Sequence, residues 1–114
     1  MTEDISIRPA PGTWTVRAAG AVLAESRAAL ELLEPGHEPV IYFPRGDVAM
    51  ALLGPTATRT TCPHKGEASY FAISTGTGDL PDAAWSYETP HAGVAGIAAH
   101  LAFHPSDRVL IERV

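Results

Sequence analysis

The sequence has only one cysteine, Cys62, among its 114 residues, so no disulfide can form within the chain. Small secreted domains usually carry an even set of cysteines, and a lone thiol is typical of a reducing compartment. The start of the chain, with Glu3 and Asp4, also lacks the basic segment and apolar run of a signal peptide. No apolar stretch approaches the roughly 20 residues that a membrane span needs. We therefore expect a cytoplasmic protein without a membrane partner.

Basic residues are also few, with eight against 13 acidic residues and a net charge of −5. They are scattered singly, whereas nucleic-acid-binding proteins gather basic residues on one face, so we expect no nucleic-acid partner. Lys65 is the only lysine in a chain that otherwise uses arginine. A lysine kept against this bias suggests a need for a compact or titratable ammonium.

What the chain does have is enough apolar material for one core, with 46% hydrophobic and 18% charged residues. A chain of this length forms a single domain and needs no disulfide or metal for stability. Ten glycines and ten prolines are spread along its whole length. They divide the chain into short segments, which favours many short strands joined by turns. We expect a mainly β domain over residues 13–114, with a loosely attached arm over residues 1–12.

The local patterns predict where these strands lie. Residues 28–34 have high helix propensity, but the turn-rich Pro35–Glu38 segment before a second apolar run favours a hairpin. The expected strands cover residues 14–18, 22–26, 30–34, 40–43, 58–62, 67–73 and 83–88, with a closing pair at 101–103 and 108–112. One short helix is expected at 47–53, and one or two helical turns between 91 and 100.

The turn at residues 62–66 holds the densest cluster of reactive side chains. Positive charge near Cys62 favours the thiolate, which would make it a nucleophile or a redox-sensitive thiol. A lone cysteine at a strand end is more often a small buried hydrophobe. Lys65, followed by Gly66, suits an anionic ligand because the backbone can approach closely there. The alternative for Lys65 is a solvated turn lysine.

A metal site is not expected. Structural zinc needs about four ligands, usually as Cys and His pairs, and the second cysteine is missing. The spacing of His91, His100 and His104 matches no common template. We therefore predict no metal and no cofactor.

Two further segments carry candidate residues. Trp85 and Tyr87 alternate along a predicted strand and so share a face, as part of the core or as the wall of a ligand site. Asp47 is expected to cap the short helix that follows it, and Arg45 with Asp47 could instead orient a ligand.

Several segments together resemble the bacterial and fungal family known as domain of unknown function 427 (DUF427), also labelled nucleotidyltransferase-like. The resemblance implies a compact Mss4-like, or β-tent, fold. Relatives with that fold bind zinc through paired cysteines, which this sequence lacks. The paired carboxylates that hold Mg²⁺ in phosphoryl-transfer enzymes are also missing. The matching segments are Tyr42-Phe43-Pro44 with Asp47, Thr61-Cys62-Pro63-His64-Lys65-Gly66 with Ala68 and Tyr70, Ala84-Trp85-Ser86-Tyr87 with Pro90, and Leu101-Ala102-Phe103-His104.

Three functions remain open at this point. The first is binding of a small polar or anionic ligand. The second is an enzyme or redox-sensitive protein that depends on Cys62, with Lys65 as the other catalytic candidate. The third is an assembly module without a small ligand. The expected ligand-binding residues of the first hypothesis are Lys65, Gly66, Arg45, Asp47, Tyr70, Trp85 and Tyr87, with the amides of the 62–66 turn as further anion donors.

Overall fold

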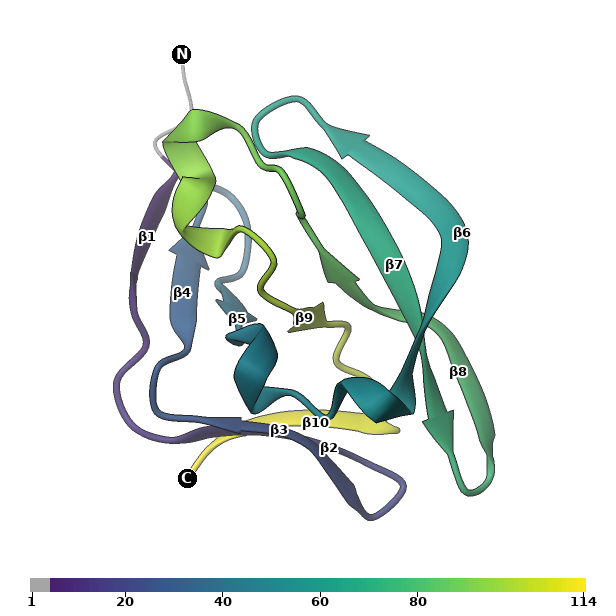
Figure 1. The fold of residues 1–114 in the computed structure, drawn as a ribbon. Helices are drawn as coiled ribbons and strands as arrows, with labels where there is room; N and C mark the ends of the chain where they lie inside the picture. The colour runs from purple at the N-terminus through teal and green to yellow at the C-terminus, as the bar shows by residue number, and fades with distance from the viewer. Residues whose placement is uncertain (1–4) are drawn as a thin grey trace.

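A computed structural model describes residues 5–114 of the chain. The prediction of a mainly β protein is confirmed, with ten strands arranged as three open antiparallel sheets in this part of the chain (Figure 1). The first sheet has the order β1 (Ser6–Pro9), β4 (Leu30–Leu33), β5 (Val40–Tyr42). The second has the order β10 (Val109–Arg113), β2 (Trp14–Ala18), β3 (Ala21–Ser26). The third has the order β6 (Leu53–Cys62), β7 (Gly66–Thr75), β8 (Gly78–Ser86), β9 (Ala102–Phe103).

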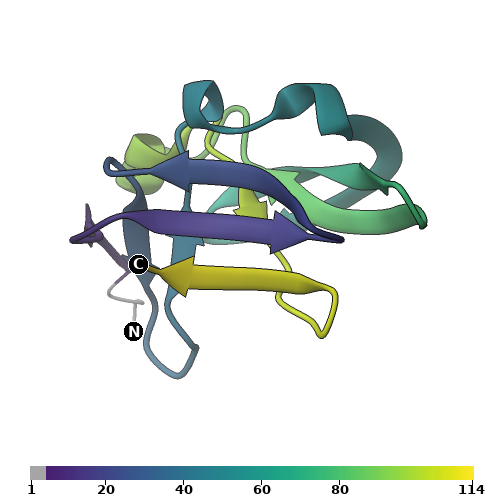
Figure 2. The same ribbon diagram turned by 90° about the horizontal axis from the view of Figure 1, so that it is seen from below.

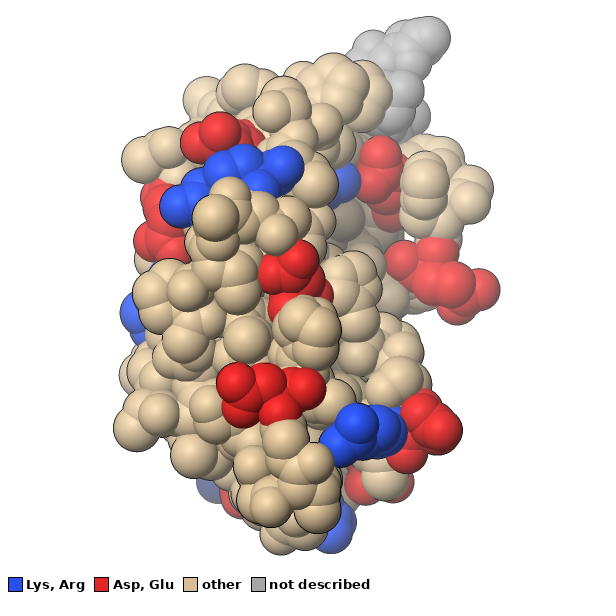
Figure 3. Space-filling model, turned by 90° about the vertical axis from the view of Figure 1, so that its right-hand side faces the viewer, with Lys and Arg blue, Asp and Glu red and all other residues tan. Residues whose placement is uncertain are grey.

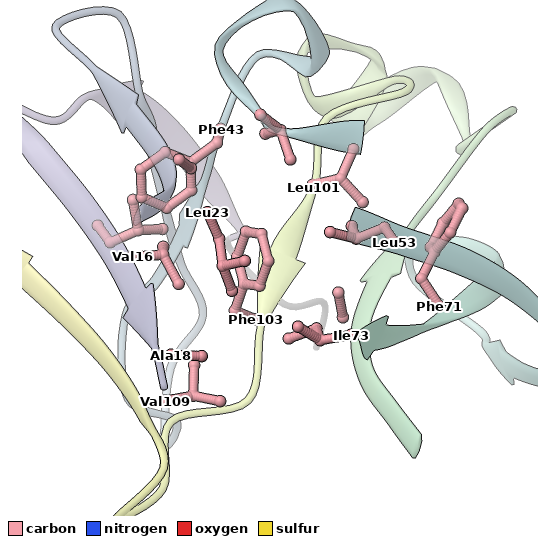
Figure 4. Close-up of a cluster of buried hydrophobic side chains, with 14 of the residues drawn as sticks. Val16, Ala18, Leu23, Phe43, Leu53, Phe71, Ile73, Leu101, Phe103 and Val109 are labelled. Atoms are coloured by element: carbon pink, nitrogen blue, oxygen red, sulfur yellow. The ribbon is translucent and has the colours of Figure 1, made fainter. Parts of the chain in front are cut away.

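The main core lies between the second and third sheets (Figure 4). Val16 and Leu23 project from the second sheet toward Ile73 of the third, with Phe43 and Phe103 between them. The two phenylalanine rings meet edge to face with their centroids 5.9 Å apart. Each fully buried side chain of this size stabilises the fold by about 1.5–3 kcal/mol. Figure 2 shows the second sheet from below, with β10 at its margin.

A single bridge joins the first sheet to the third. The amide of Phe43 donates to the carbonyl of Leu101 at 2.8 Å, and the amide of Leu101 donates back at 2.9 Å. Phe43 follows β5 directly and Leu101 precedes β9, so the bridge brings these two strands together. Because β9 pairs with β8, the end of β5 lies near Trp85.

The strand prediction for residues 30–34 is confirmed against the local helix propensity, since β4 and β5 form the expected hairpin. The helices are shorter than predicted. Residues 47–53 contain parts of two single 3₁₀ turns, η1 (Arg45–Asp47) and η2 (Met50–Leu52). The 91–100 segment forms η3 (Ala92–Ile97), two 3₁₀ pieces with a kink at Val94. Glycines at 93 and 96 disfavour a regular α-helix there.

The predicted closing strand pair is wrong, although both strands exist. β9 pairs with β8, and β10 pairs with β2 in a different sheet. Residues 6–9 of the expected loose arm form β1, which pairs with β4; residues 1–4 of that arm lie outside the described part. Within residues 5–114, no helix is long and apolar enough to cross a membrane. The Mss4-like arrangement implied by the resemblance stays a prediction.

Candidate functional site

A hollow of about 390 Å³ opens between the β4–β5 hairpin and the third sheet. Small-molecule sites commonly have volumes of roughly 300–1,000 Å³. The hairpin forms one wall, while the β6–β7 turn, β7, β8 and the segment after β9 form the other. The lining residues are Leu32, Glu34, His37, Glu38, Val40, Tyr42, Cys62, Lys65, Tyr70, Trp85, Tyr87 and His104.

The β6–β7 turn sets the position of Lys65. Cys62 and Gly66 are cross-strand partners at the end of the hairpin, and the Lys65 amide donates to the Cys62 carbonyl at 3.2 Å. Gly66 has φ +118°, a conformation that L side chains rarely adopt, which explains glycine here. The Lys65 carbonyl accepts from the amide of His91 at 2.9 Å. The Lys65 amide is therefore already used inside the turn, contrary to the expectation that turn amides would hold an anion.

The ammonium of Lys65 forms an ion pair with Glu34. Its Nζ lies 3.1 Å from Oε1 of Glu34, and the two side chains are only 13% and 15% exposed. Burial pulls the pKa of Lys65 down, but the hydrogen bond to Glu34 and nearby negative charge outweigh it and leave that pKa above its ordinary value of 10.5. Lys65 therefore carries its charge at neutral pH, and the charge is balanced inside the hollow.

Two tyrosines line the same hollow. Tyr42 is 1% exposed, and its hydroxyl accepts from Nε1 of Trp85 at 3.4 Å. Tyr87 is 6% exposed, and its hydroxyl forms no hydrogen bond with another of residues 5–114. The Lys65 Nζ lies 6.0 Å from the centre of the Tyr87 ring. Burial raises the pKa of both tyrosines, so both hydroxyls keep their protons at neutral pH.

Aromatic rings form the wall opposite the hairpin. Tyr70 and Trp85 are cross-strand partners on β7 and β8. The centroid of the His104 ring lies 4.4 Å from that of the Trp85 ring. The His104 ring is also nearly parallel to the Tyr70 ring, with their centroids 6.4 Å apart. Burial lowers the pKa of His104, although the charge of Asp82 works in the opposite direction. This wall is therefore aromatic and neutral at pH 7, with the Trp85 ring tilted by 38° to the His104 ring.

Five of the predicted residues lie around this hollow, namely Cys62, Lys65, Tyr70, Trp85 and Tyr87. Gly66 is buried in the turn and is not part of the lining.

The structure places Arg45 and Asp47 elsewhere. Arg45 donates to the carbonyl of Ala99 at 3.0 Å and forms an ion pair with Glu88. Asp47 accepts from the hydroxyl of Ser26 at 2.6 Å and lines a separate hollow. The predicted capping role of Asp47 is wrong, because the turn that follows has no side-chain cap. Both residues hold neighbouring loops together instead.

Sequence reasoning missed seven of the twelve lining residues, among them Glu34, Tyr42 and His104. A signal existed for the first two. Residues two apart on a strand point to the same face, so Leu32 and Glu34 share a face. Val40 pairs with Leu32 across the hairpin, so Val40 and Tyr42 lie on that same face of the sheet. A carboxylate on this otherwise apolar face needs a partner, and Lys65 is the partner. No comparable pattern marks His104, which lies beyond the short strand β9.

Other features of the described residues are weaker candidates. A hollow of about 480 Å³ is lined partly by Arg17 and Arg108, but both are exposed and already contact Glu112 and Thr77. No group of three or more His, Cys, Asp or Glu residues within 5–114 is placed to hold a metal ion. On the face shown in Figure 3, basic and acidic side chains are interspersed among uncharged residues.

Comparison with known families gives one match. The family described as "Domain of unknown function (DUF427)" matches residues 6–114, nearly the whole chain. None of the functionally curated proteins matches the sequence closely enough to indicate a relationship. The resemblance noted in the segments around Tyr42, Cys62 and Trp85 is thus confirmed by a match that includes all three. The chain belongs to the DUF427 family.

Proposed function

We propose that the hollow between the β4–β5 hairpin and the third sheet binds a small polar molecule with an anionic group. The observation that carries this proposal is the pairing of two donors there. Lys65, with its charged ammonium, and Tyr87, with its phenol, line one hollow. The Tyr87 hydroxyl donates to no other residue among 5–114, so it is free to donate to an acceptor on a bound molecule.

Each lining residue has a role in this proposal. An ammonium has three donor hydrogens, and one of those on Lys65 points to Glu34, which leaves two for a ligand. Tyr87 supplies a neutral donor beside it. Tyr70 and Trp85 supply the flat surface against which the rest of the molecule lies. Gly66 acts indirectly, by allowing the tight turn that presents Lys65.

A second candidate function uses the thiol. Cys62 is half-buried and lines the same hollow, and its charge contributes to the raised pKa of Lys65. In this alternative Cys62 is a nucleophile or redox-sensitive group that reacts with a molecule bound beside Lys65. It predicts that iodoacetamide alkylates Cys62 faster than a free thiol at pH 7. A rate no faster than that of the free thiol contradicts it.

The binding proposal is tested with a panel of small anions that includes carboxylates, phosphate and phosphate esters. Binding is followed by thermal shift and by protection of Cys62, the only thiol, from alkylation. We expect at least one anion to raise the melting temperature and to slow alkylation. The double variant Lys65→Met/Glu34→Gln removes the donor without leaving an unpaired charge, and it should weaken that binding about tenfold or more.

A matched control lies on the opposite face of β4. Arg8 and Glu31 form an exposed ion pair at 2.9 Å between β1 and β4, away from the hollow. Arg8→Met/Glu31→Gln should leave anion binding unchanged. The proposal is wrong if no anion binds, or if binding survives the Lys65 variant unchanged. Light scattering on the same samples would then test the assembly hypothesis through the dependence of mass on concentration.

A further inference from the structure

We infer that the ligand is a flat, conjugated monoanion, such as an aromatic carboxylate or an enolate, whose charged oxygen accepts hydrogen bonds from Tyr87 and Lys65. This inference rests on the proposed function and narrows it to one chemical class. It follows from three properties of the hollow, namely its charge balance, the kind of donor it offers and the shape of its wall.

The charge balance excludes a strongly charged ligand. The lining holds one positive charge, Lys65, against the carboxylates of Glu34 and Glu38. A phosphate group carries up to two negative charges and is usually held by several cations or by a nest of free amides. The Lys65 amide is bonded to Cys62 instead. With two carboxylates against one ammonium, this lining disfavours a dianion more strongly than a single, delocalised negative charge.

The donors are suited to a delocalised oxyanion. The Tyr87 residue is 6% exposed, and its hydroxyl has no acceptor among residues 5–114. The Tyr42 hydroxyl accepts from Trp85, which leaves its own hydrogen to donate. Since burial keeps both phenols protonated, they act as donors at neutral pH. Neutral hydroxyls together with one balanced ammonium can stabilise an enolate or carboxylate oxygen without adding net charge.

The wall is suited to a flat group. Trp85, His104 and Tyr70 follow one another as ring neighbours. The His104 and Tyr70 rings are parallel within 10°, and the Trp85 ring is tilted by 38° to that of His104. A conjugated ring or enolate can stack on such a surface, while a puckered ring of equal size makes poorer contact. The geometry therefore distinguishes ligands of equal charge by their flatness.

The test uses four probes that separate charge from shape. Benzoate and 4-nitrophenolate are flat monoanions, cyclohexanecarboxylate is a puckered monoanion, and phenyl phosphate combines a flat ring with higher charge. Binding is measured by calorimetry and by protection of Cys62 from iodoacetamide. We expect the two flat monoanions to bind in the hollow and to be at least about tenfold stronger than the other two probes. Bound 4-nitrophenol should also ionise at lower pH than the free compound, which its absorbance reports directly.

Two hydroxyl variants locate the contact. Tyr87→Phe should weaken benzoate binding about tenfold and abolish the shift in ionisation of 4-nitrophenol. Arg8→Met/Glu31→Gln is the control, since this exposed pair lies between β1 and β4 outside the hollow, and it should change neither readout. Should Tyr87→Phe fail to fold, Tyr42→Phe tests the same donor set.

The outcomes separate this inference from the broader proposal. If phenyl phosphate or cyclohexanecarboxylate protects Cys62 as well as benzoate does, the inference is overturned while the hollow remains an anion site. Benzoate binding that leaves Cys62 unprotected, or that survives both Tyr87→Phe and Tyr42→Phe, also overturns it. If no member of the anion panel binds, the proposed function itself fails.

Discussion

Breaking the ion pair between Lys65 and Glu34 should destabilise the protein strongly, although it is a single interaction. The substitution Lys65→Met removes the ammonium and leaves the Glu34 carboxylate, 15% exposed, among aromatic side chains. Removing one partner of a fully buried pair costs about 3–5 kcal/mol. Because some water reaches this pair, we expect Lys65→Met to lower the free energy of unfolding by about 2 kcal/mol. In Lys65→Met/Glu34→Gln most of that loss should be recovered, because no unpaired charge remains.

The assay is urea unfolding at pH 7, followed by tryptophan fluorescence, with Arg8→Met as the comparison. The Arg8–Glu31 pair has a similar distance, but the Arg8 side chain is 62% exposed. Exposed pairs contribute about 0–1 kcal/mol, so this variant should be nearly neutral. The reasoning fails if Lys65→Met lowers the free energy of unfolding no more than Arg8→Met does. It also fails if the double variant loses as much free energy of unfolding as Lys65→Met and Glu34→Gln lose in sum, because the two residues are then not coupled.

The same pair predicts a loss of stability in alkali. The pKa of Lys65 is raised on folding, so the folded protein holds this proton more tightly than the unfolded chain does. The contribution of the pair is complete below about pH 10.5 and is lost as the pH rises through the folded-state pKa. Tyr42 and Tyr87 have raised pKa values and act in the same direction. The double variant lacks this ammonium, so the stability of wild type relative to the double variant should fall as the pH rises above that value.

Three further substitutions test other parts of the structure. Gly66→Ala forces an L side chain into φ +118° and should cost about 1–3 kcal/mol in urea unfolding, whereas Gly46→Ala, with open space around it, should be nearly neutral. Arg45→Met should lower the melting temperature but leave anion binding unchanged, because Arg45 lies outside the hollow; a loss of binding without a loss of stability would contradict this. Asp82→Asn removes a carboxylate whose pKa is lowered by hydrogen bonds from two threonines. Wild type loses the stabilisation from this carboxylate as the pH falls through and below 3.8, and the variant should lack that pH-dependent loss. An unchanged acid unfolding curve would refute that assignment.

Local patterns predicted the strands of this fold better than they predicted which strands pair with one another. The turn at Pro35–Glu38 outweighed helix propensity in β4, and Gly66 marked the end of the β6–β7 hairpin, because both signals lie within a few residues. β9 and β10 looked like a hairpin for the same local reason. Their true partners, β8 and β2, are set by the core between the sheets, which no short segment encodes.

The candidate site was predictable to the extent that its residues share a strand face. Trp85 and Tyr87 follow from alternation along one segment, and Lys65 from its turn. Arg45 and Asp47 were assigned to the ligand because they are charged and close in sequence to Tyr42. Their partners Ala99, Glu88 and Ser26 lie far away in sequence, so their structural role appears only in three dimensions.

The single lysine of the chain has a physical explanation in this geometry. An arginine at position 65 would place a planar fork against Glu34 and use two parallel donors on that carboxylate. A lysine ammonium satisfies Glu34 with one hydrogen and keeps two others around the same nitrogen, 6.0 Å from the centre of the Tyr87 ring. The pair thus neutralises a buried carboxylate and still offers donors to the hollow. Stability depends on the charge balance of the pair, whereas ligand binding depends on the remaining hydrogens of the ammonium. A variant that removes both charges together can therefore retain the fold and still lose anion binding.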